Sequence, residues 1–309
     1  MSQPTLPTRI AGDLAVETRG VSKRYWQTRA LAGLDLQVPA GAPYVLAGPN
    51  GSGKTTAMKI LLDAVRADRG TAYVCGIETT ERPALARAHV GYVPDVPAVP
   101  YPWLSVQAFL AHHGAFYTNW DAHYARGLCA RLGLAPDARL RTLSKGTARR
   151  VALVAALAHR PPVLLLDEPA DGLDPLAREE FCGVLAEHMA AAPTTVLWCT
   201  HHVQEADALA DHLGVIREGA MVLQASRDRV HAALRRYRAQ VPDGWGGAPG
   251  LNGQVLEREQ RGREIAWTVW GDEYEVAGLL TAAGAEVHEA AALSLEDAAV
   301  ALLRAGGAS

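Results

Sequence analysis

The sequence predicts an α/β fold with a parallel core sheet. Two apolar runs, residues 163–166 and 195–199, suit central strands of a parallel sheet, which are buried on both faces. Helical stretches alternate with these runs, as an α/β core requires. A glycine-rich loop, residues 48–56, lies between a third apolar strand and a helical run. In such folds ligands collect at the carboxyl ends of the strands.

The length of the chain is consistent with two domains, and its composition indicates no particular binding partner. A chain of 309 residues suggests one large domain with a small one. The net charge of -3 supplies no general attraction for nucleic acid or anionic lipid. The best apolar stretch, residues 151–158, is far shorter than a membrane span, so no direct membrane insertion is expected. Residues 1–12 lack the apolar core of a secretory signal, which predicts a flexible tail on a cytoplasmic protein.

The elements can be taken in chain order. Residues 15–38 alternate apolar positions with turn residues and predict antiparallel strands, and residues 44–47 predict the strand before the glycine-rich loop. A helix over residues 57–64 and short strands at 73–75 and 90–93 follow. Prolines between residues 94 and 102 mark a loop. Apolar residues at helical spacing over 104–135 predict a helical lobe.

The composition changes after residue 227, where the sequence becomes rich in arginine and glycine. We expect a strand at 265–270, a helix at 272–283, a strand at 285–288 and a last helix, which Ser294 and Asp297 would begin as a capping box. Residues 229–309 are therefore predicted to form a small α+β accessory domain beside a main domain at 13–228. The alternative is a partly disordered tail, because residues 242–253 are rich in glycine.

The first chemical motif is GPNGSGKTT, residues 48–56, placed between a strand and a helix. Its glycines let backbone N–H groups turn toward phosphate oxygens, and the helix adds its positive end. Lys54 would reach the β and γ phosphates, the Thr55 hydroxyl would hold Mg²⁺, and Thr56 would touch the α phosphate. The residues expected to bind ATP here are Gly48, Asn50, Gly51, Ser52, Gly53, Lys54, Thr55 and Thr56.

The second motif is a pair of acids at the end of the apolar strand 163–166. Side chains alternate across a strand end, so Asp167 and Glu168 would do different work. Asp167 would hold Mg²⁺ and Glu168 would activate the attacking water as a general base. Alone, the pair would be an ordinary acidic turn after a strand.

Further motifs accompany these two in a fixed order. LSKGT stands at 143–147, before Asp167, and is followed by DGLD at 171–174 and THH at 200–202. Together they resemble the ABC ATPase family over residues 15–227, with a helical lobe at about 96–158. The resemblance implies a P-loop NTPase fold with an added antiparallel β subdomain, the cofactors ATP and Mg²⁺, and two cassettes that face each other.

The resemblance also assigns roles to residues. It implies that Ser144 and Gly146 contact the γ phosphate bound by the opposite cassette, at the start of a helix expected over 148–159. His201 matches the switch histidine, in preference to His202. An aromatic ahead of the phosphate loop stacks on adenine in this family, and Tyr25 occupies that place, with Trp26 as runner-up. Asp174 matches the loop that communicates across the dimer.

Three positions depart from the family norm. Asp95 stands where glutamine is usual, Lys145 replaces glycine, and Thr147 replaces glutamine. Asp95 would contact the metal through water, because its stem is shorter than that of glutamine. The acid at 95, the Lys-Gly signature, the NWD stretch at 119–121 and LSLED at 293–297 resemble exporter-type cassettes of bacterial drug and antibiotic-response transporters.

These observations predict an ATP-hydrolysing subunit that dimerises around two ATP and drives a separate membrane permease from the inner face of the cell membrane. Its expected catalytic residues are Lys54, Glu168 and His201, and its expected metal ligands are Thr55, Asp95 and Asp167. The permease would dock near residues 95–103. Two alternatives stay open: a soluble ABC ATPase acting on DNA or the ribosome, and an ATP-sensing module without useful turnover. Neither the cargo nor the choice between homodimer and heterodimer follows from the sequence.

Overall fold

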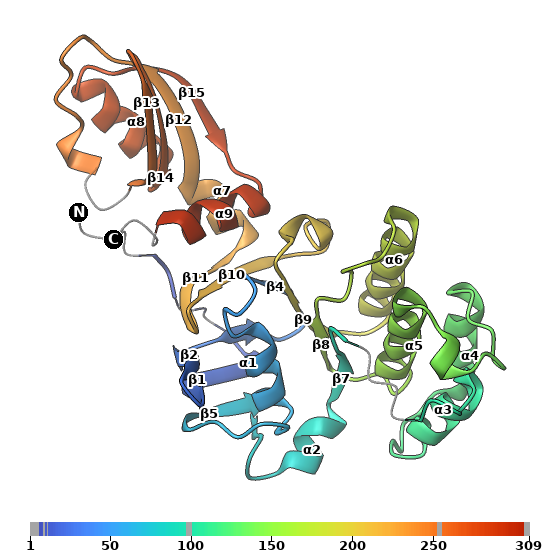
Figure 1. Cartoon of the computed structure of the whole chain (residues 1–309). Coiled ribbons are helices and arrows are strands. Elements are labelled where there is room, and N and C mark those ends of the chain that lie inside the picture. The colour runs from blue at the N-terminus through green and yellow to red at the C-terminus, as the bar shows by residue number, and fades with distance from the viewer. Residues whose placement is uncertain (1–5, 9, 11, 97–100, 252–254, 306–309) are drawn as a thin grey trace.

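The computed structural model describes residues 6–8, 10, 12–96, 101–251 and 255–305, and it confirms the predicted α/β fold class (Figure 1). Parts of three predicted segments lie outside the described residues. They are the tail (1–5, 9 and 11), the proline-rich loop (97–100) and the glycine-rich segment (252 and 253).

The central sheet has six strands, five of them parallel. In spatial order they are β11 (Ala220–Ser226), β10 (His212–Arg217), β4 (Pro43–Ala47), β9 (Thr195–Thr200), β8 (Val163–Asp167) and β7 (Val90–Val93). Only β11 runs antiparallel to its neighbour. All residues of β4, β8 and β9 are buried, as expected for central strands covered on both faces. The carboxyl ends of these three adjacent strands lead into residues 48–56, Glu168 and His201 respectively.

Each face of the central sheet has its own core. On one face Leu46 packs in a cluster with Met58 of α1 (Lys54–Leu61) and with Leu31 of the N-terminal sheet. On the other face Val45 belongs to the core formed with α5 (Lys145–Leu157) and α6 (Pro175–Ala191). Both α1 and α5 begin three residues earlier than the sequence predicts, since each includes residues of the preceding motif.

The N-terminal antiparallel strands form a separate sheet, in agreement with the prediction for residues 15–38. Its strands are β2 (Thr28–Leu34), β1 (Leu14–Tyr25), β5 (Arg69–Val74) and β6 (Ile77–Glu78), with β3 (Gln37–Pro39) also paired to β1. The short α2 (Pro83–Ala88) follows β6. Part of the predicted tail contacts both sheets: the Ile10 N–H donates to the Gln37 side-chain oxygen of β3 at 2.9 Å, and the Gln224 N–H of β11 donates to the Pro7 carbonyl at 2.7 Å.

The helical stretch predicted at 104–135 is two helices, α3 (Val106–Gly114) and α4 (Ala122–Arg131). Ser105 and Asp121 cap them, each side chain accepting a backbone N–H three residues on. A single 3₁₀ turn, η1 (Leu140–Thr142), then leads to α5. In Figure 1 these helices lie beyond β7 and β8, on the side away from the C-terminal sheet.

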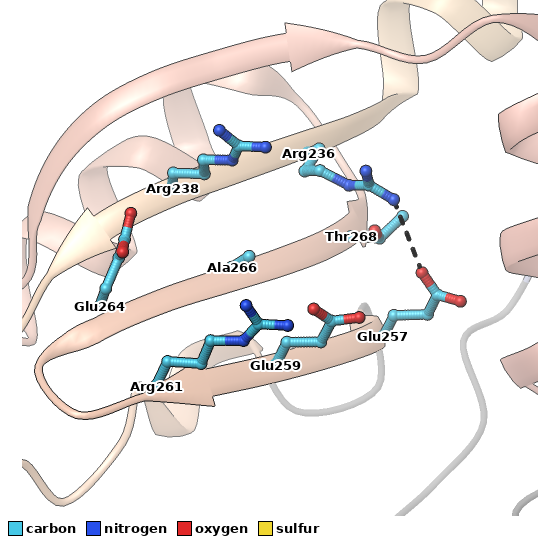
Figure 2. A pocket seen from close by; sticks show the side chains of 8 residues that line it. All are labelled: Arg236, Arg238, Glu257, Glu259, Arg261, Glu264, Ala266 and Thr268. Carbon is cyan, nitrogen blue, oxygen red and sulfur yellow. Dashed lines mark ion pairs between the residues drawn. The ribbon is translucent and has the colours of Figure 1, made fainter.

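The C-terminal region contains a four-stranded antiparallel sheet, in the order β13 (Val255–Arg261), β14 (Glu264–Trp270), β12 (Leu234–Gln240) and β15 (Glu286–Ala292). The short helices α7 (Arg227–Ala233) and η3 (Pro249–Leu251) accompany it, and α8 (Glu273–Ala282) covers one face. The last strand runs to Ala292, not to residue 288. The opposite face carries charged side chains around a shallow pocket of about 290 Å³ (Figure 2).

The last helix, α9 (Leu295–Ala305), contacts β13 of the four-stranded sheet and also packs against β10 and β11 of the central sheet. Of the predicted capping box the structure shows the Ser294 N-cap: its hydroxyl accepts the Asp297 N–H at 3.1 Å and donates to the Asp297 carboxylate at 2.8 Å. Since α9 contacts the central sheet, the division into domains at 13–228 and 229–309 stays a prediction.

Candidate active site

The phosphate loop is shaped by glycines that no other residue could replace. A Cβ on Gly48 would lie 2.5 Å from the Ile216 carbonyl oxygen, and one on Gly53 would lie 2.5 Å from that of Ala30. Gly53 also has a φ of 108°, which side chains rarely adopt. It precedes α1 and no side chain caps the helix. The first N–H groups of α1 are therefore left to bind an anion.

Lys54 lies folded against this loop. Its side chain is 5% exposed, and its Nζ donates to the carbonyl oxygens of Gly48 at 2.6 Å and Pro49 at 3.2 Å. The same Nζ lies 3.3 Å from Oε1 of Glu168. The loop, the ammonium group and the second acid of the predicted pair thus meet at one point.

The acid pair at the end of β8 points two ways, as the alternation of side chains predicts. Asp167 turns toward Thr55, whose hydroxyl donates to its Oδ1 at 3.2 Å, whereas Glu168 turns toward His201. Glu168 has a φ of 46°, a strained backbone for a residue with a side chain. Such strain is typical of functional positions, because the surrounding structure must hold it.

Asp167 and Thr55 fit the expected Mg²⁺. Asp167 is fully buried, and its Oδ2 has no hydrogen-bond partner. The pKa of Asp167 is raised to about 6, mainly by burial; the nearby carboxylates of Asp95 and Glu168 contribute to the rise, and the Thr55 hydrogen bond opposes it. Within the described ranges no three His, Cys, Asp or Glu side chains could hold a metal by themselves. Mg²⁺ suits this arrangement, since it keeps water and phosphate ligands beside one or two protein oxygens.

His201 lies at the end of β9 and contacts the predicted general base. Its Nδ1 is 2.9 Å from Oε2 of Glu168, and its backbone N–H donates to the same oxygen at 3.3 Å. The ring of the neighbouring His202 lies tilted against the His201 ring, 3.9 Å between centroids, while the His202 N–H donates to the Thr200 hydroxyl. The structure therefore places His201, and not His202, against the acid.

The signature residues lie at the start of α5. Ser144 caps the helix by accepting the Thr147 N–H at 3.1 Å, and a Cβ on Gly146 would lie 3.3 Å from Leu173. Among the described residues no hydrogen bond or ion pair joins Ser144 or Gly146 to the phosphate loop. Within one chain, the described contacts thus do not join the two halves of the predicted nucleotide site.

Lys145, which stands where the family has glycine, forms an ion pair. Its Nζ lies 2.8 Å from Oδ2 of Asp171, in the loop that follows Glu168. The hydrogen bond from Lys145 lowers the pKa of the Asp171 carboxyl. Asp174, at the end of the same loop, caps α6 by accepting the Ala177 N–H at 2.9 Å.

Asp95 contacts an arginine that the sequence reasoning missed. Arg149 of α5 is fully buried and lies 3.5 Å from the Asp95 carboxylate, and it donates to the Asp95 carbonyl oxygen at 2.5 Å. Burial lowers the pKa of Arg149. No hydrogen bond of the described residues joins Asp95 to Thr55 or Asp167, so its metal role stays a prediction. An arginine pair leading into the apolar run 151–158 was the available signal.

The remaining predicted contacts lie around the loop. Ser52 is buried with an unpartnered hydroxyl, and Asn50 is exposed. Tyr25, at the end of β1, is 39% exposed with the Lys23 ammonium 5.5 Å from its ring, whereas Trp26 is 98% exposed. Both aromatics are accessible, so stacking on adenine stays a prediction for either, as do the nucleotide contacts of Thr56.

Comparison with known proteins identifies the family of the chain. The family model described as "ABC transporter" matches residues 31–171. The chain is 35% identical over 236 residues to the daunorubicin/doxorubicin resistance ATP-binding protein DrrA of Streptomyces peucetius, covering 74% of this chain and 69% of that one. This chain belongs to the ABC transporter ATP-binding family.

Two further similarities agree with the family. The Nod factor export ATP-binding protein I of Burkholderia orbicola is 37% identical over 217 residues, 68% of this chain and 70% of that one. A solved structure of an ATP-binding subunit of an ABC transporter superposes with a TM-score of 0.65 at 26% identity, over 71% of this chain and 92% of that one. Resemblance to exporter-type cassettes is thereby confirmed, and the chain is an ATP-binding subunit of that type.

Proposed function

We propose that this chain hydrolyses ATP to ADP and phosphate and that hydrolysis drives a separate membrane permease, which exports its cargo. The observation that carries the proposal is the position of Glu168, with Lys54 at 3.3 Å and His201 at 2.9 Å. A carboxylate between a cation and a switch imidazole, beside a phosphate loop, suits the activation of water for attack on a γ phosphate.

Each side chain has a separate task in this reaction. Lys54 binds the β and γ phosphate oxygens, and the backbone of residues 48–56 surrounds the triphosphate. Glu168 orients the attacking water and accepts its proton, while His201 donates a hydrogen bond to the γ phosphate. Mg²⁺, held by Thr55 and Asp167, would neutralise charge that develops on the phosphate oxygens.

We propose further that the site is completed by a second cassette. Ser144 and Gly146 lie at the N-terminal end of α5, where backbone N–H groups favour an anion. Their separation from the phosphate loop of the same chain supports a role toward a nucleotide bound by another copy or by a related subunit. Two ATP molecules would then be enclosed between two cassettes.

The test compares wild type with Glu168→Gln, using phosphate release and sedimentation in ATP and Mg²⁺. We expect the variant to bind ATP, to become an ATP-dependent dimer and to lose at least about a hundredfold in turnover, because a general base contributes about 10²- to 10⁴-fold. Glu179→Gln, at an exposed position on α6, is the matched control and keeps full turnover. A wild type that binds ATP without turnover, alone or with a permease, would leave only an ATP-sensing role.

Transport requires a docking surface for the permease, and the structure offers an apolar groove beside the loop that follows β7. The groove has a volume of about 310 Å³ and includes Tyr92, Pro94, Phe109, Tyr117 and Leu143 among its lining residues. Within the described ranges no helix has the length and apolarity of a membrane span. The printed names of the two curated relatives, one for drug resistance and one for export, support an exporter at the inner face of the membrane.

Docking can be tested with two exposed aromatics. Trp103 is 63% exposed and belongs to the predicted docking segment, whereas Tyr274, 86% exposed, lies on α8. We expect Trp103→Ala to lose co-purification with a permease from native membranes and Tyr274→Ala to keep it, with ATP turnover of the isolated chain unchanged in both. Wild type that captures no permease under these conditions would contradict the transport proposal.

A further inference from the structure

Helix α9 is fixed to the central sheet although it belongs to the C-terminal end of the chain. Leu295 and Leu302 are buried in the core cluster that contains Leu213 of β10. At the far end of the helix the Arg217 guanidinium donates to the carbonyl oxygens of Leu302 and Leu303, at 3.4 and 3.2 Å. The C-terminal carbonyls of α9 are thus partly satisfied by a residue of the central sheet.

The first turn of α9 reaches the segment that follows the switch histidine. This segment contains a single 3₁₀ turn, η2 (Val203–Glu205), immediately after His201 and His202. No side chain of its own N-cap residue, His202, bonds to its first N–H groups. Instead Oε2 of Glu296 accepts the Gln204 N–H at 2.9 Å, from 92 residues further along the chain. Glu296 therefore supplies the cap that the local sequence lacks.

The other side of η2 is held by buried polar contacts. Glu205 is 8% exposed and its carboxylate lies 3.8 Å from the Arg178 guanidinium. The His202 N–H donates to the Thr200 hydroxyl at 2.9 Å. With Glu296 on one side and these contacts on the other, η2 has a defined position. His201, which bonds to Glu168, is separated from η2 by His202 alone.

We propose that Glu296 is a positioning residue for His201, through which the C-terminal region sets the rate of ATP hydrolysis. The proposal rests on the proposed function, because the role of His201 in hydrolysis belongs to it. Within the described part of the chain, no hydrogen bond or ion pair joins Glu296 to residues 48–56 or to the acid pair. It orients η2, and a displacement of α9 by the four-stranded sheet is transmitted to the imidazole through two residues of chain.

The experiment measures ATP turnover for wild type, Glu296→Ala, Glu296→Gln and Ser294→Ala. Glu296→Ala removes the acceptor, and we expect kcat to fall about three- to tenfold, the effect of one lost hydrogen bond to a charged group that is part-exposed. The KM for ATP stays unchanged because Lys54 is untouched. Glu296→Gln keeps an acceptor oxygen and restores most of the rate. Ser294→Ala, the matched control, removes the N-cap of α9 without touching η2.

A second readout follows amide hydrogen exchange in residues 201–206. We expect faster exchange in Glu296→Ala than in wild type or Ser294→Ala, since the cap of η2 is lost. Wild-type turnover and exchange in Glu296→Ala would overturn the inference, as would equal losses of rate and thermal stability in Ser294→Ala. A wild type without turnover would instead overturn the proposed function, and this inference with it.

Discussion

Two parts of the molecule gather charged side chains in opposite ways. At the carboxyl end of the parallel sheet, Asp167 and Glu168 are buried, and one Asp167 oxygen has no partner. On the outer face of the C-terminal sheet the charged side chains are exposed or half-buried, and some of them form ion pairs. Figure 2 shows Arg236 directed at Glu257, 3.9 Å away, with Arg238 on the same strand and Glu259 and Arg261 beside Glu257.

The difference separates a site from a solvated surface. A buried polar atom without a partner costs about 1–3 kcal/mol or more, so each such atom calls for an explanation. An exposed ion pair costs little and contributes about 0–1 kcal/mol. Abundance of charge therefore does not identify a site, whereas the buried, unpartnered oxygen of Asp167 beside the Thr55 hydroxyl fits the proposed metal.

The largest expected effect follows from removing the buried ammonium group. Lys54→Ala should weaken ATP binding about a thousandfold, because two or more charge-assisted hydrogen bonds of about 1.5–3 kcal/mol each are lost. Equilibrium titration with a fluorescent ATP analogue measures this affinity. Lys59→Ala, at an exposed lysine of the same helix, is the control and should bind as wild type does. Equal affinity of the two variants for ATP would contradict the assignment of Lys54 to the ATP-binding site.

The contrast between buried and exposed groups extends to acid stability. Burial lowers the pKa of His159 to about 4 in the folded state, whereas the ordinary pKa of histidine is 6.5. Between these two pH values the unfolded chain binds a proton at His159 that the folded chain does not bind. This contribution is complete above pH 6.5 and is lost as the pH falls toward 4, by up to about 3 kcal/mol. Urea unfolding at pH 7 and pH 4.5 should show a smaller loss for His159→Gln than for wild type. The exposed His288, replaced by glutamine, should leave the pH profile unchanged.

A smaller effect is expected at the buried arginine beside Asp95. Two of the Arg149 nitrogens, Nε and Nη1, are buried without a hydrogen-bond partner. Arg149→Met fills a similar volume without the cost of burying charge, and should raise the free energy of unfolding by about 1–2 kcal/mol while slowing turnover. Urea denaturation and phosphate release measure the two effects. A lower free energy of unfolding in Arg149→Met would show that the contacts of Arg149 with Asp95 stabilise the fold by more than the burial of the guanidinium costs.

The smallest effect belongs to the C-terminal surface. Arg238 and Glu289 lie 3.4 Å apart with half of each side chain exposed. Arg238→Ala should change the free energy of unfolding by less than about 0.5 kcal/mol and leave ATP turnover at the wild-type value. A loss of ATP turnover in Arg238→Ala would mean that the outer face of the C-terminal sheet influences the ATP site.

The sequence predicts best what its local pattern decides. The strand, glycine-rich loop and helix around Lys54 follow one another within about twenty residues, and the fold class follows from such units. Strand β12, with the sequence LRRYRAQ, was not predicted, because three arginines hide the alternation that turns Tyr237 and Ala239 toward α8. The charged β13 was missed for the same reason.

Contacts between distant residues that no motif marks could not be predicted. The pairing of Arg149 with Asp95 joins a helix to a loop 54 residues earlier, and Glu296 reaches Gln204 across 92 residues. Nothing in the spacing of these residues specifies such a meeting, since it depends on how the elements pack. The positions of Lys54, Glu168 and His201 in the chain were predictable, but the distances between their side chains were not.

The ion pair between Lys145 and Asp171 gives the molecule a mechanical property. It joins the first turn of α5 to the loop that follows Glu168, so that a movement of α5 would be passed on to that loop. Both side chains are about half exposed, and salt screens such pairs strongly. Higher ionic strength is therefore expected to weaken this contact between α5 and the loop that follows Glu168.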